Sequence, residues 1–328
     1  MKLLIAGGAG YVGSTLIPKL LDRCYKVDVV DLFWFGNHLP SQVGVLNKDI
    51  FRLTVEDLRT YDQVIFLAGL SNDPMAEFSP SKNFVLNAAA PAYLGYIAKI
   101  AGVKRYIYAS SCSVYGYTEN ELYDETRPVS SSYPYGISKL LGEQAVSQLV
   151  SDNFSVICLR KGTISGYSPR MRLDLIVNTM FKTALRDGTI TVNNPSIWRP
   201  ILSIEDAATA YVRAVEANAK ISGVFNLASG NYTVGEVADV VKDTLSERIG
   251  LRIGLNIQHI QDFRNYKVNT EKAANVLSFH ASGNVRSIVN NLIDSMDRFQ
   301  DWNNPLYSNI QTFKELESRV EIPSMVAA

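Results

Sequence analysis

Cysteine, histidine and net charge are all scarce in this sequence. Its 328 residues contain 3 Cys and 3 His, and 32 Lys and Arg balance 32 Asp and Glu. The cysteines are widely spaced with no CxxC pair, which favours a reducing, cytoplasmic location over a disulfide framework. No histidines cluster at metal-ligand spacing, so we expect no metal. The zero net charge argues against nucleic acid or an anionic membrane as the main partner.

Long hydrophobic runs are also missing. No stretch approaches the roughly 18 consecutive apolar residues of a membrane span. The N-terminal apolar stretch is too short for a signal-peptide core and is better interpreted as a buried strand. Because 47% of the residues are hydrophobic and 20% are charged, the composition is that of a soluble globular protein. The length suits two domains, or one large domain with an added lobe.

Short apolar runs alternate with amphipathic stretches over the first half of the chain. The runs typical of buried strands cover residues 3–6, 27–30, 64–68, 105–109 and 155–159. The amphipathic stretches between them, typical of helices, lie near 11–23, 83–101 and 133–150. Repeated strand–helix–strand units predict an α/β fold, with a doubly wound parallel Rossmann sheet over residues 1–165.

The regular alternation of predicted strands and helices ends at about residue 165. Loops rich in Gly, Pro, Ser and Asn separate candidate helices near 172–187, 204–218 and 233–249. We expect residues 166–328 to form mainly a smaller, C-terminal substrate-binding lobe. An apolar strand near 223–228 is expected to rejoin the main sheet.

A glycine-rich turn directly follows the first predicted strand and opens a helix. Gly7 suits a tight turn, Gly10 lets the backbone approach a pyrophosphate, and Gly13 lets the helix pack closely on the sheet. Asp31 ends the second strand, where a carboxylate accepts hydrogen bonds from an adenosine ribose and repels a 2′-phosphate. No Arg or Lys follows it in residues 32–36. The pattern predicts a dinucleotide site that prefers NAD over NADP.

A tyrosine and a lysine, Tyr135 and Lys139, stand one helical turn apart. An adjacent ammonium lowers the pKa of a phenol, so we expect Tyr135 to exchange protons near neutral pH. Ser111 follows a predicted strand at its carboxyl end, where the ligands of open α/β sheets bind, and it is placed to hydrogen-bond a substrate hydroxyl or carbonyl. These three residues predict a catalytic set that moves a hydride on and off a carbinol carbon.

With these motifs the sequence resembles the extended short-chain dehydrogenase/reductase family, specifically its nucleotide-sugar branch. The resemblance covers nearly the whole chain, and it implies NAD as cofactor and Ser111, Tyr135 and Lys139 as catalytic residues. The motifs and the resemblance together indicate these cofactor-binding residues: Gly7, Gly10, Tyr11, Val12, Gly13, Asp31, Asp49, Ile50, Leu67, Ala68, Asn87, Tyr135 and Lys139. For a nucleotide-diphosphate sugar, the resemblance implies these substrate-binding residues: Ser113, Asn178, Arg199 and Arg264. The two arginines offer forks that suit a diphosphate.

Departures from the family pattern narrow the chemistry. Ser111-Cys112-Ser113 replaces the Thr-Asp-Glu of the 4,6-dehydratases, and the decarboxylating members tend to carry Glu at the Ser113 position. Members that epimerise and then reduce place a cysteine at that position. Cys112 lies one residue earlier, on the other face of a strand, so we interpret it as buried packing. Ser71 stands where a lysine often reaches the cofactor, and Lys161-Gly162-Thr163 replaces a frequent aromatic and Asn segment near the sugar pocket.

The sequence is best interpreted as an NAD-dependent nucleotide-sugar epimerase that acts at C4 through a transient 4-keto sugar. The alternatives are an NAD(P)H-dependent 4-ketosugar reductase, a 4,6-dehydratase, and a non-catalytic nucleotide-sensing member of the fold. The nucleotide and the sugar stay open. We also expect a homodimer, because the helices near 83–101 and 133–150 resemble a family four-helix interface. The small and apolar residues expected to be exposed there are Ala88, Ala89, Ala90, Leu140, Leu141 and Ala145.

Overall fold

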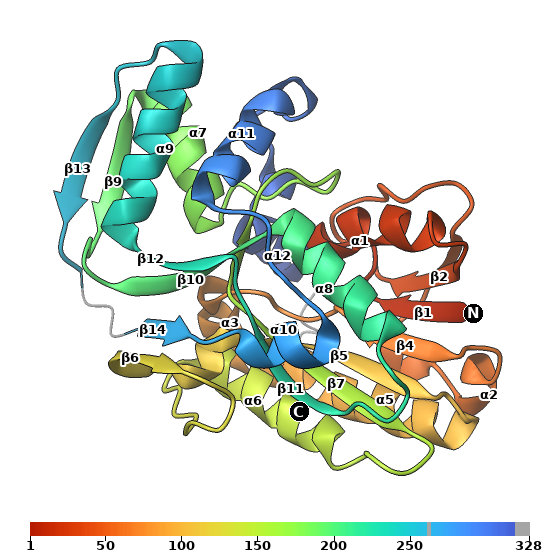
Figure 1. Cartoon of the computed structure of the whole chain (residues 1–328). Coiled ribbons are helices and arrows are strands. Elements are labelled where there is room, and N and C mark those ends of the chain that lie inside the picture. Colours follow the sequence, from red (N-terminus) through yellow and green to blue (C-terminus); the bar gives the residue numbers. More distant parts are fainter. Residues whose placement is uncertain (261–263, 319–328) are drawn as a thin grey trace, which may run out of the picture.

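Seven parallel strands form the centre of the protein in a computed structural model that describes residues 1–260 and 264–318 (Figure 1). In chain order the strands are β1 (Lys2–Ala6), β2 (Lys26–Asp31), β3 (Gly44–Asn47), β4 (Gln63–Phe66), β5 (Arg105–Ser111), β7 (Ser155–Lys161) and β11 (Gly223–Leu227). Their order across the sheet is β11-β7-β5-β4-β1-β2-β3. The order reverses between β1 and β4, so the predicted doubly wound sheet is confirmed. Only β3 was not anticipated, because it is a short edge strand with every second residue exposed.

Helices cover both faces of this sheet. On one face lie α1 (Tyr11–Leu21), α8 (Ile204–Glu216) and α10 (Glu271–Leu277), and on the other lie α2 (Val55–Leu58), α5 (Ala90–Ala101) and α6 (Pro134–Ser147). Successive side chains of each strand point to opposite faces of the sheet and pack into the hydrophobic core on each face. In β1, Leu3 and Ile5 pack towards α1 and α8, whereas Leu4 packs towards α5. Both faces are therefore buried, which explains why the strands appear in the sequence as continuous apolar runs.

One helical stretch, Pro80–Ala101, is long and apolar enough on average to cross a membrane. It consists of α4 (Pro80–Phe84), a π-helical turn η2 (Val85–Ala89) and α5. The sequence analysis did not anticipate this average. In the fold, 44% of its 18-residue window is buried.

The second half of the chain builds a lobe above the carboxyl edge of the sheet (Figure 1). Its helices are α7 (Ile176–Asp187), α9 (Val234–Ile249) and α11 (Val285–Asp294). Its strands are β8 (Thr163–Ser165), β10 (Trp198–Ser203) and β12 (Gly230–Thr233) in one small sheet, and β9 (Thr189–Asn193) and β13 (Gly254–Gln258) in another. Helix α7 begins at Ile176, later than predicted, because residues 172–175 belong to a loop that lines a cavity.

Shorter elements connect the sheet to the lobe. They are η1 (Ile50–Arg52), α3 (Asp73–Phe78), η3 (Cys112–Tyr115), β6 (Tyr117–Tyr123), β14 (Asn265–Val268), η4 (Met296–Arg298), η5 (Pro305–Tyr307) and α12 (Asn309–Ser318). Helix α12 returns to the sheet domain, where Phe313 packs in a cluster with Leu70, Met75 and Trp34. The end of the described chain thus covers loops that follow β2 and β4.

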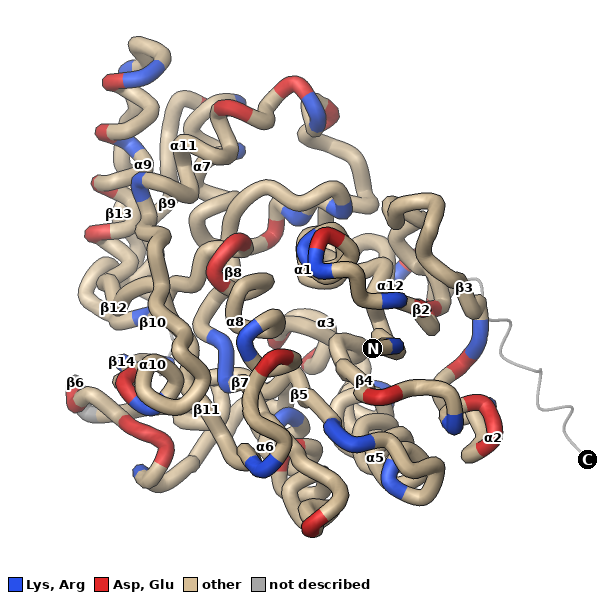
Figure 2. Tube along the Cα trace, turned by 45° about the vertical axis from the view of Figure 1, so that its right-hand side comes forward, with Lys and Arg blue, Asp and Glu red and all other residues tan. Residues whose placement is uncertain are grey.

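Charged residues of both signs are interspersed over the molecule. Figure 2 shows positive and negative positions mixed along α9 and across the remaining elements. This distribution fits the balance of 32 basic and 32 acidic residues in the sequence.

Candidate active site

A cavity of about 670 Å³ lies at the carboxyl edge of the sheet, beneath the lobe. Segments that follow β1, β2, β4, β5 and β7 line it on one side, and residues of the lobe and of α12 line it on the other. This is the position at which open α/β sheets bind ligands, next to the reversal of strand order. Among the residues that the structure describes, no group of three or more His, Cys, Asp or Glu could hold a metal ion.

The glycine turn shapes one end of the cavity. Gly7 has a φ of +77°, and a Cβ there would lie 2.4 Å from the backbone nitrogen of Ala68, so only glycine fits. A Cβ on Gly13 would lie 2.1 Å from the Gly8 carbonyl oxygen, which explains how α1 approaches the sheet so closely. Helix α1 begins at Gly10 with no side-chain cap, so its first N–H groups are available to an anion. The residues of this turn that line the cavity include Gly7, Gly10, Tyr11 and Val12.

Asp31 lies at the end of β2, beside this turn. Its carboxylate accepts hydrogen bonds of 2.9 Å from the N–H groups of Ala9 and Phe33. Burial raises the pKa of Asp31, and the N–H groups of Phe33 and Ala9 partly oppose that rise. Other predicted cofactor residues also line the cavity here: Asp49, Ile50, Leu67 and Ala68. The uncapped helix end, the glycine cradle and the carboxylate together fit a dinucleotide.

The three predicted catalytic residues meet in the same cavity. Ser111 ends β5, and its Oγ lies 3.1 Å from the Oγ of Ser113. Tyr135 lies in the first turn of α6, next to the helix-starting Pro134, and Lys139 follows one turn later. Ser111 hydrogen-bonds the Tyr135 side chain, an interaction that lowers the pKa of the phenol. The side chains of Ser111, Tyr135 and Lys139 therefore line the same part of the protein, where a substrate can reach all three.

The pKa values of this set differ from the expectation. Burial raises the pKa of Tyr135 above its ordinary value, and the hydrogen bond from Ser111 only partly offsets it. Burial also lowers the pKa of Lys139 well below its ordinary value, and the nearby Lys161 adds to that effect. The predicted neutral-range phenol is therefore corrected, because burial pushes both groups towards their uncharged forms.

Lys161 is a second cation in this part of the cavity. It ends β7 in register with Ser111, so the two side chains leave the sheet on the same face. Burial lowers the pKa of Lys161 to about 7. The substituted segment Lys161-Gly162-Thr163, noted in the sequence as a departure, thus lines the cavity beside the catalytic serine.

The lobe contributes Arg199 from β10 and Arg264, both of which line the cavity. Arg199 is 8% exposed and its guanidinium lies 5.5 Å from the centroid of the Tyr266 ring. It donates to the carbonyl oxygen of Arg264, whose own guanidinium forms an ion pair with Asp73 of α3. Ser113, also predicted to contact substrate, faces the same space and lies 3.4 Å from the Tyr266 hydroxyl. The structure therefore brings the two predicted arginines together.

Three predicted site residues, Gly13, Asn87 and Asn178, are not among the residues that line the cavity. Asn178 is fully buried, and its amide bonds the Arg172 carbonyl, the Gly166 backbone and the Tyr11 hydroxyl. It does not line the cavity, because its hydrogen-bonding capacity is used to hold the loop before α7.

Asn87 also lies behind the cavity wall rather than on it. Its amide donates to the Leu70 carbonyl at 2.8 Å, to Asn83 and to the Ser138 hydroxyl. Its side-chain nitrogen therefore ties the loop after β4 to α6, while its Oδ1 has no hydrogen-bond partner in the described chain.

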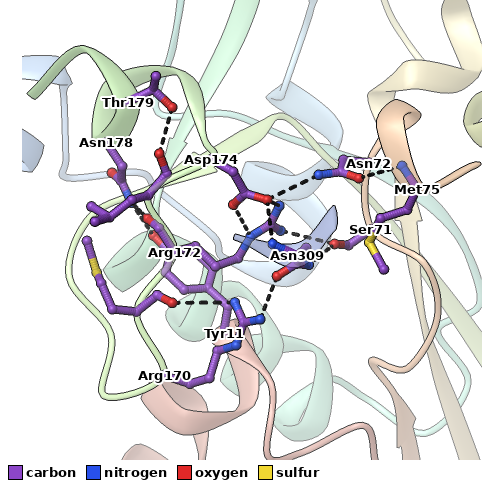
Figure 3. Close-up of polar contacts among 12 residues, drawn as sticks. Tyr11, Ser71, Asn72, Met75, Arg170, Arg172, Asp174, Asn178, Thr179 and Asn309 are labelled. Atoms are coloured by element: carbon purple, nitrogen blue, oxygen red, sulfur yellow. Dashed lines mark hydrogen bonds and ion pairs between the residues drawn. The ribbon is translucent and has the colours of Figure 1, made fainter. Parts of the chain in front are cut away.

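Sequence reasoning missed a polar network on the opposite wall (Figure 3). Arg172 makes two hydrogen bonds to Asp174, of 2.8 and 3.1 Å, and a third of 3.1 Å to the Ser71 hydroxyl. Asn309 of α12 donates to the same hydroxyl at 2.6 Å and accepts from Arg170 at 2.5 Å. The alternating Arg-x-Arg-x-Asp of residues 170–174 is visible in the sequence, but the helix predicted near 172–187 included Arg172 and Asp174.

Comparisons with known proteins agree with this geometry. Residues 3–228 match the NAD dependent epimerase/dehydratase family. UDP-glucuronic acid decarboxylase 3 of Arabidopsis thaliana is 26% identical over 300 residues, which cover 87% of this chain and 86% of that protein. UDP-glucose 4-epimerase of Bacillus subtilis is 26% identical over 292 residues, 77% of this chain and 84% of that protein. A solved structure of MoeE5 with UDP-glucuronic acid and NAD has a TM-score of 0.80 and 25% identity, covering 91% of this chain and 99% of that one.

Proposed function

Because this chain belongs to the NAD-dependent epimerase/dehydratase family and uses NAD as its cofactor, we propose that it is a nucleotide-sugar epimerase that inverts C4. The observation that carries the proposal is the meeting of Ser111, Tyr135 and Lys139 in one cavity with the dinucleotide cradle. These three side chains can serve the proton transfer at a carbinol carbon, and a dinucleotide held in the cradle would accept the hydride.

Each residue of the set has a distinct role. When bound, NAD supplies a reversible hydride acceptor. Tyr135 takes the proton of the C4 hydroxyl and returns it to the 4-keto oxygen, acting as base and then as acid. Ser111 donates a hydrogen bond to the C4 oxygen. The hydrogen bond from Ser111 and the positive charge of Arg172 oppose the rise in the pKa of Tyr135, and the positive charge of oxidised NAD beside the phenol would lower it further for the first step. Rotation of the 4-keto sugar before the hydride returns inverts the carbon.

The residues around Ser111 favour epimerisation over elimination. Loss of water from the sugar needs an acid and a base beside the reacting carbon, and residues 111–113 offer two hydroxyls and a thiol. The Cys112 thiol points to the carbonyl oxygen of Arg160 at 3.1 Å, and burial raises its pKa to about 12. Within the described chain, the carboxylates that line the cavity lie on other segments: Asp31, Asp49, Asp73 and Asp174.

The substrate side of the proposal rests on Arg199 and Arg264. A guanidinium presents a planar fork that matches the oxygens of a diphosphate, and both arginines line the cavity. The Arg199 guanidinium bonds the backbone carbonyl of Arg264, whose own guanidinium pairs with Asp73. MoeE5 was solved with UDP-glucuronic acid and with UDP-glucose, so UDP-sugars are the first candidates to test. Uronic acids deserve inclusion because the Lys161 ammonium faces the cavity.

We expect purified protein, without added reductant, to convert one of UDP-glucose, UDP-galactose or UDP-glucuronic acid into an isomer of unchanged mass. Mass spectrometry and proton NMR of the product would identify the inverted carbon. Loss of water or of carbon dioxide would contradict the proposal in favour of a dehydratase or a decarboxylase. Turnover that requires a 4-keto sugar and NAD(P)H would identify a reductase instead.

The proposed enzyme is a homodimer that associates through α5 and α6, which pack side by side on one face of the sheet. The exposed residues differ from those expected, since Ala88 and Ala90 are buried. The large apolar side chains that are exposed on these helices and on α4 and η2 are Phe84, Val85, Tyr96, Ile100, Ile137 and Leu141. Such a patch is typical of a subunit interface. Light scattering at micromolar concentration should give twice the 36.3 kDa chain mass, and a monomer mass would refute the dimer.

A further inference from the structure

Two buried arginines, Arg170 and Arg172, line the cavity beside a single pairing carboxylate. Arg170 is 2% exposed and Arg172 is 5% exposed. Arg172 takes both oxygens of Asp174 in a bidentate ion pair. Among residues 1–260 and 264–318, Arg170 has no carboxylate within 4.0 Å. The nearby Asp31 uses its oxygens on backbone N–H groups. One positive charge is therefore left to face the cavity.

The guanidinium of Arg170 is held in a fixed position. It lies 3.7 Å from the centroid of the Phe35 ring, donates to the Asn309 side chain at 2.5 Å and reaches the Met171 carbonyl oxygen at 3.5 Å. Its Nε is buried without a hydrogen-bond partner in the described chain. Burial and the neighbouring Arg172 lower the pKa of Arg170 to about 9, and the more distant charges of Asp174 and Asp31 only partly oppose that fall. A buried donor of this kind is costly unless a ligand completes its bonding.

The loop that carries Arg170 is attached directly to the start of α1. The Tyr11 hydroxyl donates to the Gly166 carbonyl at 2.6 Å, and the Ser168 hydroxyl donates to the Tyr11 carbonyl at 2.7 Å. Arg170 and the uncapped start of α1 therefore line the same cavity, on segments that are bonded to each other. A helix N-terminus and a buried guanidinium whose Nε has no partner in the described chain, both at one cavity, form a site for an anion.

The residue at position 71 supports the same interpretation. Ser71, in the segment after β4, lines the cavity with an uncharged side chain. Its hydroxyl accepts from Arg172 and Asn309, and Asn309 in turn holds Arg170. The positive charge comes from another segment of the chain (Figure 3).

We propose that Arg170 is a cofactor-binding residue that pairs with the diphosphate of the dinucleotide, held in position by Asn309 of α12. The proposal goes beyond the reaction at C4. It concerns only the binding of the dinucleotide. It can therefore fail while the epimerase proposal holds, and it can hold while the epimerase proposal fails. It also gives α12 a role, because the C-terminal helix then fixes a residue of the cofactor site.

The test compares how tightly R170Q and the unaltered protein bind three probes. NADH affinity is measured by fluorescence titration, and the affinities of ADP-ribose and adenosine are measured by their competition with NADH. NADH and ADP-ribose contain the diphosphate, and we expect R170Q to bind both about 10- to 100-fold more weakly, because a charged hydrogen bond is lost. Adenosine lacks the diphosphate, and its affinity should be unchanged. Equal weakening of all three probes would overturn the proposal by showing a structural role. NADPH is titrated as a further probe. A larger loss of affinity for NADPH than for NADH in R170Q would overturn the proposal in favour of a contact with a 2′-phosphate.

Two further variants separate position from charge. R170K keeps the charge without the fork and should recover part of the lost NADH affinity. N309A keeps Arg170 but frees its guanidinium, and a several-fold loss confined to NADH and ADP-ribose is expected. R248Q, on the exposed surface of α9, is the matched control and should leave all three affinities unchanged. N309A affinities equal to those of unaltered protein would refute the positioning role of α12, whatever the folding yield of R170Q.

Discussion

Replacement of Tyr135 by phenylalanine is expected to lower turnover by roughly 10²- to 10⁴-fold, the usual effect of removing a general acid–base group. The substitution deletes one hydroxyl and keeps the ring, so packing at the start of α6 should persist. Burial raises the pKa of Tyr135, and the phenol hydrogen-bonds Ser111 in the cavity. The residue therefore holds the proton that the proposed mechanism moves.

Steady-state kinetics and ligand binding together check this prediction. The Tyr135→Phe variant should retain NAD and bind nucleotide sugar with little change, so kcat falls while KM stays close to its original value. Tyr117→Phe, at a tyrosine that is 50% exposed on β6, is the matched control and should turn over normally. Unchanged kcat in Tyr135→Phe would rule out the proposed mechanism for an epimerase and for a reductase.

Replacement of Glu143 by leucine is expected to destabilise the fold by about 3–5 kcal/mol, because it leaves a buried arginine unpaired. Glu143 of α6 and Arg160 of β7 are 3% and 5% exposed. They share hydrogen bonds of 2.6 and 3.0 Å, and the Ser110 hydroxyl adds a third to Glu143 at 2.6 Å. Burial opposes the charge of Arg160, but Glu143 holds the pKa of that guanidinium above its ordinary value. The pair attaches the helix that carries the catalytic tyrosine to the sheet.

Urea unfolding of a double-mutant cycle checks this second prediction. The double variant Glu143→Leu with Arg160→Met should be clearly more stable than Glu143→Leu alone, because no charge is left buried. Simple additivity of the two single effects would contradict the argument. The control is Glu247→Leu, which breaks an exposed pair with Arg286 and should cost about 1 kcal/mol or less.

Structural features that are set by residues close together in the chain could be predicted from the sequence. The glycine turn follows a strand and opens a helix, so its geometry around Gly7 and Gly13 is set by steric limits on a few residues. Tyr135 and Lys139 lie four apart on one helix, and Ser111 lies at the end of a buried strand. Because the carboxyl ends of parallel strands share one edge, these local facts were enough to place the catalytic set in one cavity.

Motif matching was less reliable for the direction in which a side chain points. Asn87 and Asn178 both occupy positions that resemble family contacts, yet both amides are used inside the protein. The face that a helical residue presents depends on which elements pack against the helix. The sequence around each asparagine does not contain that information.

The sequence by itself determined the sheet, the glycine turn and the candidate catalytic set, since apolar periodicity and local spacing along the chain predict them. Only the tertiary structure decided the opposite wall of the cavity. Ser71 and Asn309 are 238 positions apart, and Arg170 and Asn309 are 139 apart, yet they meet in one network. It also decided that the pKa of Tyr135 is raised, because desolvation depends on everything that surrounds a group in space, whereas spacing along the chain records only its nearest charges.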